Sequence, residues 1–407
     1  MNAHVVIAGA GQAGGRTAQA LRRLGYTGRI TLVGDETLPP YERPPLSKDV
    51  LLGRADISSL ALLAKEDWAG IGVDLRLDVA VREIERDARS VQLGDGMTLA
   101  YDQLVIATGA RARGFPGLVD PATEVLQLRS VADAARIAPE LAPGRHVGVI
   151  GAGFIGLELA ATARALGAAV TLVEAAPRPL ARLLPAEFAA QLVALHRERG
   201  VQLHLGVAVE RLTSSAIHLA DGHRIDVDAI VVGIGAQAND EIAAAAGLAV
   251  RDGVVVDACG RSSDPHIFAV GDVARHVDPG AGLDHRLESW RNAEDGAVAV
   301  ASAILGLAPP APSVPWFWTN QYGQNIQIAG RPQDTHRRHC ATEATTGPRI
   351  VYYLDAEDRI RGVIGVDCPR EIRGAMKLMQ SDRTVTVSEL PVPRPRPQAL
   401  ALEETSR

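Results

Sequence analysis

Residues 4–14 read HVVIAGAGQAG, an apolar run that leads into the pattern G-x-G-x-x-G. Residues 147–156 read VGVIGAGFIG and repeat the same arrangement. After each copy, a helical pattern and a second apolar run end in an acid, at Asp35 and at Glu174. Strand, glycines, helix, strand and acid together are typical of a dinucleotide-binding β-α-β unit. Two such units predict two bound dinucleotides, as is required when electrons pass from one to the other.

The glycines have separate roles in such a unit. The first permits a sharp turn, the second lets a pyrophosphate approach the backbone, and the third lets helix and strand pack closely. The phosphates then meet the free N–H groups and the positive dipole end of the helix. A glycine turn alone can be purely structural. The acids are a second signal, because a carboxylate about 20 residues further on reaches the ribose hydroxyls.

The acid of the second unit also bears on the choice of cofactor. A 2′-phosphate beside Glu174 would suffer like-charge repulsion, so we expect this site to favour NADH over NADPH. Arg178 and Arg182 follow closely and could weaken this preference, or they could simply be solvated.

Composition limits the classes of function. The chain has 407 residues, enough for two or three domains, with 47% hydrophobic and 22% charged residues. Its net charge of −6 and the lack of a long basic run make nucleic acid an unexpected partner. We expect no signal peptide at the N-terminal apolar run, which glycines break early, and no run reaches about 18 apolar residues. We therefore expect no membrane association and a cytoplasmic location.

The three cysteines, Cys259, Cys340 and Cys368, form neither a C-x-x-C pair nor a metal-ligand cluster. A dithiol–disulfide reductase needs two close cysteines beside its flavin, so that class is excluded. We expect no metal, iron–sulfur or haem site in the chain itself.

Further patterns indicate how the chain is organised. Asp95-Gly96 and Asp221-Gly222 are hairpin turn signals, one after each glycine unit. The proline-rich residues 38–48 are expected to lack regular structure. A helix is predicted from about Asn292 to Leu305, and residues 316–389 alternate strand and helix patterns.

The two glycine units, the ATG at 107–109, the GD at 271–272 and a third domain resemble the glutathione-reductase-like superfamily. Three further motifs narrow this resemblance: RPPLSK at 43–48, GLELA at 156–160 and LESWRNA at 287–293. Together they are similar to the FAD-dependent NADH:ferredoxin reductase components that serve aromatic-ring dioxygenases or bacterial cytochromes P450. The resemblance extends from residue 1 to about 385 and does not separate these two groups.

The resemblance implies an α/β fold with two Rossmann-like dinucleotide-binding domains, for FAD and NAD, and a smaller C-terminal α+β domain. The FAD-binding domain is split between residues 1–112 and 238–312, and the NAD-binding domain covers 113–237. The C-terminal domain covers 315–390, and 391–407 is expected to be a disordered tail.

The resemblance also implies the cofactor sites. FAD has Asp35 on its ribose, Asp272 on its ribityl chain, Lys48 and Trp290 near the flavin ring and Arg129 toward the flavin side. The full FAD set is Gly9, Gly11, Ala13, Gly14, Asp35, Lys48, Ala107, Thr108, Gly109, Arg129, Gly271, Asp272 and Trp290. The NADH set is Gly151, Gly153, Gly156, Glu158, Glu174 and Gly235, with Glu158 and Gly235 toward the nicotinamide.

Lys48 and Glu158 are the candidate catalytic residues, as an ion pair across the junction of the two domains. The alternatives are an ordinary loop lysine, and an acid favoured by the dipole in the first turn of a helix. Trp316 and Trp318 alternate as on a strand, so they should share one face. Either one covers the flavin or they plug a domain interface.

In the implied reaction, NADH gives a hydride to FAD, and electrons leave singly to a [2Fe-2S] ferredoxin that feeds an oxygenase. Because ferredoxins are usually acidic, a local basic surface is expected. The densest cluster is Arg331, His336, Arg337, Arg338 and His339, which could equally be a solvated loop. The chain is expected to be a monomer or a homodimer. Two other classes stay open: an NADH oxidase or other small-acceptor reductase, and a non-catalytic NADH-sensing flavoprotein.

Overall fold

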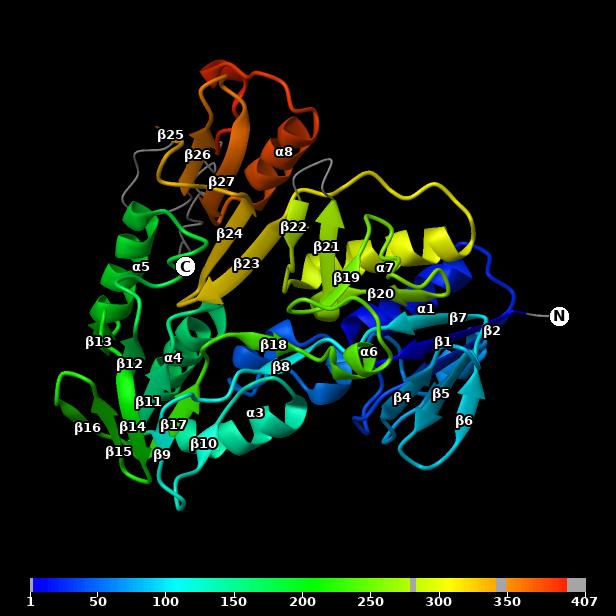
Figure 1. Ribbon diagram of the computed structural model, residues 1–407. Coiled ribbons are helices and arrows are strands. Elements are labelled where there is room, and N and C mark those ends of the chain that lie inside the picture. Colours follow the sequence, from blue (N-terminus) through cyan, green and yellow to red (C-terminus); the bar gives the residue numbers. More distant parts are fainter. Residues whose placement is uncertain (1–2, 279–282, 342–348, 394–407) are drawn as a thin grey trace, which may run out of the picture. The chain divides into compact units, whose positions relative to one another are not determined.

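The computed structural model of the chain describes residues 3–278, 283–341 and 349–393 (Figure 1). It forms two compact units, residues 1–322 and residues 323–407. The first unit contains both glycine turns. Most of the tail expected at 391–407 lies outside the described residues.

The first glycine turn belongs to a five-stranded parallel sheet with the order β20-β7-β1-β2-β3. Its strands are β1 (His4–Ala8), β2 (Arg29–Val33), β3 (Val73–Arg76), β7 (Gln103–Ile106) and β20 (Ile267–Ala269). The chain therefore returns to this sheet after it has built the second one.

Both faces of the first sheet are covered, and the two-residue period of a strand decides which side chain goes where. Val5 and Ile7 lie in a core with helices α1 (Gln12–Arg23) and α7 (Trp290–Ile304). Val6 and Ala8 lie in a different core on the opposite face. That face is covered by an antiparallel sheet of β4 (Val81–Glu85), β5 (Ser90–Leu93) and β6 (Thr98–Ala100).

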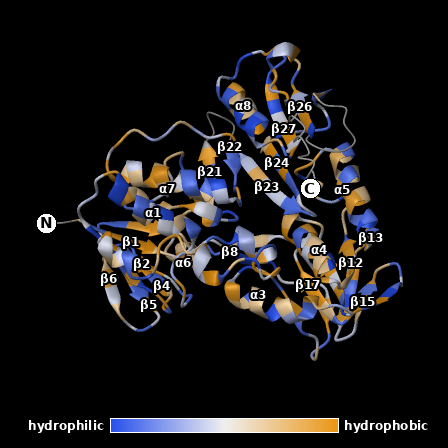
Figure 2. Cartoon of the chain, turned by 180° about the vertical axis from the view of Figure 1, so that it is seen from behind, coloured by the Kyte–Doolittle hydropathy of each residue, from blue (hydrophilic) through white to orange (hydrophobic). Residues whose placement is uncertain are grey.

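The second glycine turn belongs to a parallel sheet of the same design, in the order β10-β17-β11-β12-β13. Its strands are β10 (Val125–Leu126), β11 (His146–Ile150), β12 (Ala169–Glu174), β13 (Val201–Leu205) and β17 (Ala229–Val232). Helices α4 (Phe154–Leu166) and α5 (Ala186–Glu198) pack against it. The other cover is a sheet of β14 (Val209–Thr213), β15 (Ala216–Leu219), β16 (Arg224–Asp226) and β9 (Leu118–Val119). Figure 2 shows hydrophobic residues gathered along the inner strands of both sheets.

Two antiparallel strands, β8 (Ala110–Ala112) and β18 (Ala236–Ala238), connect the two halves of the first unit (Figure 1). The remaining helices of this unit are α2 (Asp67–Gly70), α3 (Val131–Ile137) and α6 (Glu241–Ala245), and its remaining strands are β19 (Val254–Val256), β21 (Ala274–Asp278), β22 (Leu283–His285) and β23 (Trp316–Gln321). The predicted Asp95-Gly96 and Asp221-Gly222 turns join β5 to β6 and β15 to β16, with positive φ at both glycines.

The second unit has an antiparallel sheet in the order β24-β27-β26-β25, with one helix against it. These elements are β24 (Gln324–Gly330), β25 (Arg337–Cys340), β26 (Arg349–Leu354), β27 (Ile360–Val366) and α8 (Pro369–Gln380). The expected alternation of strands and helices is wrong here, because among the described residues of this unit the strands all precede the one α-helix. This order is still that of an α+β fold.

The proline-rich stretch also differs from expectation. Residues Pro44–Ser47 form a 3-10 helix, with prolines in its first turn. A proline is tolerated there because its missing N–H would have had no partner within the helix. Along the part of the chain that the structure describes, no helix is both long enough and apolar enough to cross a membrane.

Candidate functional site

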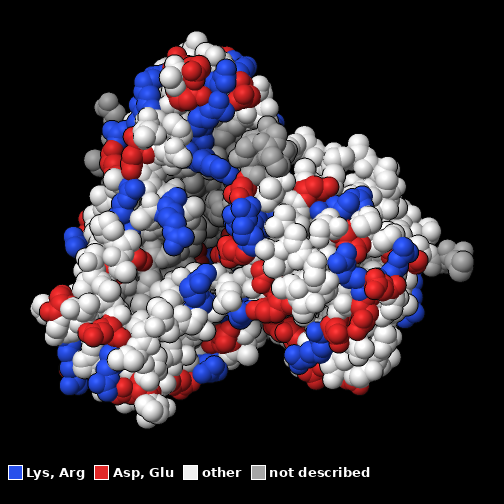
Figure 3. Space-filling model, in the orientation of Figure 1, with Lys and Arg blue, Asp and Glu red and all other residues white. Residues whose placement is uncertain are grey.

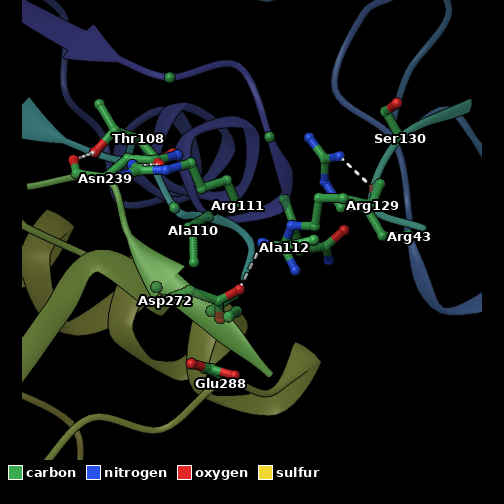
Figure 4. Close-up of a pocket in the computed structure, with 18 of the residues that line it drawn as sticks. Arg43, Thr108, Ala110, Arg111, Ala112, Arg129, Ser130, Asn239, Asp272 and Glu288 are labelled. Atoms are coloured by element: carbon green, nitrogen blue, oxygen red, sulfur yellow. Dashed lines mark hydrogen bonds and ion pairs between the residues drawn. The ribbon is translucent and has the colours of Figure 1, made fainter. Parts of the chain in front are cut away.

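A cavity of about 970 Å³ in the first unit is lined by residues of both glycine turns. Figure 4 shows a part of its lining. Most of the predicted site residues line it, although they come from both parallel sheets and from distant parts of the chain. Those lining residues are Gly9, Gly11, Ala13, Asp35, Lys48, Ala107, Thr108, Gly109, Arg129, Gly153, Glu158, Gly235, Gly271, Asp272 and Trp290.

Four predicted residues do not line the cavity: Gly14, Gly151, Gly156 and Glu174. Gly14 and Gly156 are where helix and strand come together. A Cβ there would lie 1.9 Å from the Gly9 carbonyl oxygen and 2.0 Å from the Gly151 carbonyl oxygen. These two glycines allow the turn to form and would not touch a ligand.

The second glycine of each pattern is different, because it leaves free space. A Cβ added at Gly11 would have the Arg43 Nη2 as its nearest atom, at 3.9 Å, and one added at Gly153 would have the Gly233 carbonyl oxygen, also at 3.9 Å. Both glycines are the N-cap residues of their helices, without a side-chain cap. The free N–H groups of α1 and α4 therefore face open space, which fits the pyrophosphate of a dinucleotide at each turn.

The acid after β2 is followed by a second acid, whose contacts sequence reasoning missed. Asp35 is exposed at the cavity, and its carboxylate has no hydrogen bond to the described residues. The adjacent Glu36 accepts hydrogen bonds from Tyr41 Oη at 2.7 Å and from Arg43 Nη2 at 2.5 Å. Arg43 also donates from Nη1 to the carbonyl oxygen of Arg129 at 2.7 Å. The acid-acid pair after β2 and the arginine in the RPPLSK motif were the available signals.

Arg43 holds a positive charge close to the first glycine turn. Burial would lower the pKa of its guanidinium, but Tyr41, Glu36 and Asp272 outweigh this effect and leave it raised. The side chain therefore stays a cation beside the place where phosphates would lie.

Glu174 is fixed by the backbone. Its two carboxylate oxygens accept hydrogen bonds from the N–H of Ala152 at 2.6 Å and the N–H of Ala176 at 2.7 Å. The first of these N–H groups lies inside the second glycine turn, so the acid is tied to the turn that it was predicted to serve. Each carboxylate oxygen keeps a further lone pair for a ribose hydroxyl.

Arg129 and Asp272 form a salt bridge at 2.6 Å across the cavity wall, and Figure 4 shows the two side chains facing each other. Close by, Thr108 and Asn239 exchange hydrogen bonds of 2.7 Å and 2.9 Å, which fasten the two connecting strands together (Figure 4). Asn239 lines the cavity and was not predicted.

Lys48 and Glu158 meet as a buried ion pair, with Nζ 2.9 Å from Oε2. The carboxylate also accepts hydrogen bonds from the hydroxyls of Ser47 and Thr319. The helix-dipole alternative for Glu158 is wrong, because α4 has no acid in its first turn and Glu158 lies one turn further in. The loop-lysine alternative for Lys48 is wrong as well, because the side chain is buried and paired.

Tryptophans form one wall of the cavity. Trp316 and Trp318 are stacked at 4.8 Å on β23, so the prediction that they share a face is confirmed. Trp290 meets Trp318 edge to face at 5.8 Å. The buried Nε1 of Trp290 has no hydrogen-bond partner among the described residues. An unpaired buried donor at a cavity fits a polar ligand there.

None of the cysteines, all of which are described, lines the cavity. Burial, Glu371 and Asp367 raise the pKa of Cys368 to about 11, so this thiol is neutral near pH 7. Within the described ranges no group of His, Cys, Asp and Glu side chains could hold a metal ion.

The basic cluster lies in the second unit. Arg337, Arg338 and His339 belong to strand β25, which is at an edge of its sheet, and Arg337 pairs with Asp358. Arg331 and His336 lie in the loop and turn before this strand, so the cluster is part loop and part strand, and its docking role stays a prediction.

Two family models together match most of the chain. The family model described as pyridine nucleotide-disulphide oxidoreductase matches residues 3–297. The model described as reductase C-terminal matches residues 316–395.

Similar proteins match over almost their whole length. The ferredoxin–NAD(+) reductase component of the anthranilate 1,2-dioxygenase system of Burkholderia cepacia is 39% identical over 95% of this chain and 97% of its own. Putidaredoxin reductase, in its covalent complex with putidaredoxin, superposes with a TM-score of 0.90 and 36% identity, covering 96% of this chain and 95% of that one. The ferredoxin reductase for the CYP199A2 system of Rhodopseudomonas palustris also gives a TM-score of 0.90 and 36% identity, over 95% and 96% of the two chains.

Proposed function

The chain belongs to the pyridine nucleotide-disulphide oxidoreductase family, and on that premise we propose that it is an NADH:ferredoxin reductase. The observation that carries the proposal is one continuous cavity reached by both glycine turns, so that two dinucleotides can meet in it. The similar proteins named above include a dioxygenase component and a reductase for a P450-type system, and either kind of oxygenase is compatible with this chain.

FAD binds along the first glycine turn. The open space at Gly11 and the cation of Arg43 fit its pyrophosphate, and Asp35 fits its ribose hydroxyls. Arg129 and Asp272 hold the middle of the cofactor, and the unpaired Nε1 of Trp290 supplies a donor near the flavin end. These assignments give a ligand partner to the Asp35 carboxylate and to the Trp290 Nε1, which have no hydrogen bond to the described residues.

NADH binds at the second glycine turn. The open space at Gly153 takes the pyrophosphate, and Glu174 takes the adenine ribose from a fixed position. The nicotinamide enters beside Gly235 and Glu158, which line the same cavity as the residues of the first turn.

FAD bound at this site would supply the redox chemistry, since it can take a hydride from NADH and give up the two electrons singly, one to each of two ferredoxins, with release of one proton. The residues of the chain orient and stabilise. The Lys48 ammonium presents positive charge at the cavity wall. This charge would stabilise extra electron density on the flavin ring beside it. Glu158 holds that ammonium in place, and the stacked Trp316 and Trp318 exclude water from one side.

The acceptor is a small acidic protein with a [2Fe-2S] cluster, and both proteins are cytoplasmic in this proposal. Basic and acidic side chains are interspersed on the face drawn in Figure 3, so docking depends on local clusters more than on the net charge of −6. The cluster Arg331, His336, Arg337, Arg338 and His339 is the candidate docking surface.

An anaerobic stopped-flow experiment tests the function. NADH should bleach the flavin absorbance rapidly, a [2Fe-2S] ferredoxin should restore it rapidly, and air should restore it slowly. Rapid reoxidation by air, with none by ferredoxin, would assign the chain to the NADH oxidases. A flavin that NADH does not bleach would contradict the proposed function altogether.

A further inference from the structure

A line of hydrogen-bonded side chains runs from Glu158 away from the cavity. Thr319 Oγ1 lies 2.6 Å from Glu158 Oε1, and Gln321 Nε2 lies 3.1 Å from Thr319 Oγ1. The line continues from Gln321 Oε1 to His196 Nε2 at 2.8 Å, and from His196 Nδ1 to Tyr322 Oη at 2.9 Å. It crosses helix α4, strand β23 and helix α5.

All the donors in this line point toward Glu158. A carboxylate paired with a lysine can only accept, so the Thr319 hydroxyl donates to it and accepts from the Gln321 amide. The Gln321 oxygen must then accept from His196 Nε2–H. Burial lowers the pKa of His196 more than its bond to Gln321 raises it, so the ring is neutral and its Nδ1 accepts from Tyr322.

Four of the five side chains in the line are buried. His196 and Thr319 are 0% exposed, Gln321 is 1% exposed and Glu158 is 4% exposed. Buried polar side chains of this kind are seldom the most stabilising choice, because well-packed apolar groups are often as good. Each polar side-chain atom in the line nevertheless has at least one partner, and the donors and acceptors fit together in only one order.

The far end is anchored. Tyr322 has a φ of 52°, which is unfavourable for a residue with a side chain. Its ring packs edge to face on His196 at 5.1 Å and lies under the guanidinium of Arg199 at 5.3 Å. These contacts hold a conformation that the backbone alone would not choose.

We propose that Thr319, Gln321 and His196 are positioning residues that fix the Glu158 carboxylate in the orientation that binds Lys48. The inference rests on the proposed function, in which the flavin ring lies beside the Lys48 ammonium. A shift of that ammonium would then change the properties of the flavin. Without the Thr319 hydroxyl, Glu158 loses one of three donors, the others being Lys48 and Ser47. The carboxylate can then rotate and the ammonium can follow it.

The competing explanation is that the line merely packs α5 against β23. Two substitutions at one position separate the explanations. Thr319→Val keeps the shape of the side chain and removes the hydroxyl, whereas Thr319→Ser keeps the hydroxyl and removes a methyl group. Thr171→Val is the matched control, because Thr171 is also fully buried and its hydroxyl bonds to His146 at 2.9 Å, away from the cavity.

The readouts are the midpoint potential of the bound flavin, from an equilibrium dye titration, and the rate of its reduction by NADH. We expect Thr319→Val to shift the potential and to slow reduction about tenfold or more, as for a lost hydrogen bond to a charged group. Thr319→Ser and Thr171→Val should stay close to the parent protein in both. In a Glu158→Gln background, Thr319→Val should add little, because its effect acts through that carboxylate.

Three results would overturn the inference: Thr319→Ser more impaired than Thr319→Val, Thr319→Val equal to the Thr171→Val control, or an undiminished effect in the Glu158→Gln background. Should Thr319→Val fail to retain flavin, Tyr322→Phe provides a second test. It removes only the last hydroxyl, and a change in flavin potential smaller than that of Glu158→Gln but above the control is expected. If NADH does not reduce the parent protein, the proposed function fails. The midpoint potential of the bound flavin in the variants would still test the role of the hydrogen-bonded side chains.

Discussion

The two glycine turns have the same sequence pattern but different surroundings. At both, the second glycine caps a helix and leaves space for a phosphate. The first turn lies among Arg43, the Arg129–Asp272 salt bridge and Trp290, which reach it from distant parts of the chain. From the second, only residues 153–155 of the turn line the cavity. We infer that the first turn retains its dinucleotide and that the second exchanges it at each turnover.

Asp35 and Glu174, the acids that follow the two glycine turns, also differ in their surroundings. Asp35 is exposed, with its carboxylate available, and the neighbouring Glu36 is bonded to Tyr41 and Arg43. Glu174 is already bonded to two backbone N–H groups and is fixed before any ligand arrives. A pre-positioned acid suits a ligand that binds and leaves repeatedly, because little ordering is left to be done at each binding event.

The largest expected effect comes from adding a side chain at the second glycine of each turn. Gly11 and Gly153 have φ of −87° and −76°, so valine fits the backbone at both. In Gly11→Val the side chain would occupy the phosphate space and weaken FAD binding by about ten- to hundredfold. Purified protein should be nearly colourless, which an absorbance ratio of flavin to protein measures.

Gly153→Val is the matched control for that experiment. It should keep its flavin, while kcat/KM for NADH with ferricyanide falls about tenfold or more. If both variants lose flavin equally, or if both keep it, the two sites are not divided between a retained and an exchanged cofactor.

A smaller effect is expected at Glu174. In Glu174→Gln, one backbone N–H keeps its acceptor, but the charge that repels a 2′-phosphate is gone. The ratio of kcat/KM for NADH to that for NADPH should fall about tenfold. Asp35→Asn should leave this ratio unchanged and weaken flavin retention instead. Equal use of both nucleotides by the unmutated protein would contradict the assignment of Glu174.

Local patterns predicted the fold well because each cofactor turn is encoded within a short stretch. The apolar runs at 4–8 and 146–150 are strands, and the residues after each glycine pattern are helices. The α/β class with two parallel sheets and a C-terminal α+β part is confirmed. The order of elements in residues 316–389 was mispredicted, because short apolar runs do not distinguish strands from helices.

The site was harder to predict where it depends on contacts between distant residues. Asn239 and Thr319 carry no motif of their own, and only the fold brings them to the cavity or to Glu158. The pairing of Lys48 with Glu158 was predicted from a family resemblance, and spacing alone could not have shown it.

A several-fold effect is expected where electrons leave. Arg337→Gln with Arg338→Gln should slow ferredoxin reduction, most strongly at low salt, because screening acts over about 10 Å at 0.1 M. Glutamine avoids a like-charge contact beside Asp358. Reduction of ferricyanide, which needs no protein docking, should change much less.

Matched controls for this pair lie in the same unit. Arg370 and Arg373 are exposed on α8, so Arg370→Gln with Arg373→Gln removes the same charge from another place. The docking role of strand β25 would be contradicted if both double variants lost ferredoxin reduction equally. It would also be contradicted if the loss did not depend on salt concentration.

The smallest effect is expected from replacing the cysteines. A near-zero effect would support direct electron transfer between the two dinucleotide sites. If both electrons pass directly between two dinucleotides in one cavity, no thiol is needed between them. Replacing Cys259, Cys340 and Cys368 together with Ala should change the rate of flavin reduction by NADH less than about twofold. The raised pKa of Cys368 keeps that thiol neutral and weakly nucleophilic, since the thiolate is the reactive form. A folded, flavin-bound triple variant that no longer turns over would show that a thiol carries electrons between the two sites, and the direct transfer inferred from their shared cavity would be wrong.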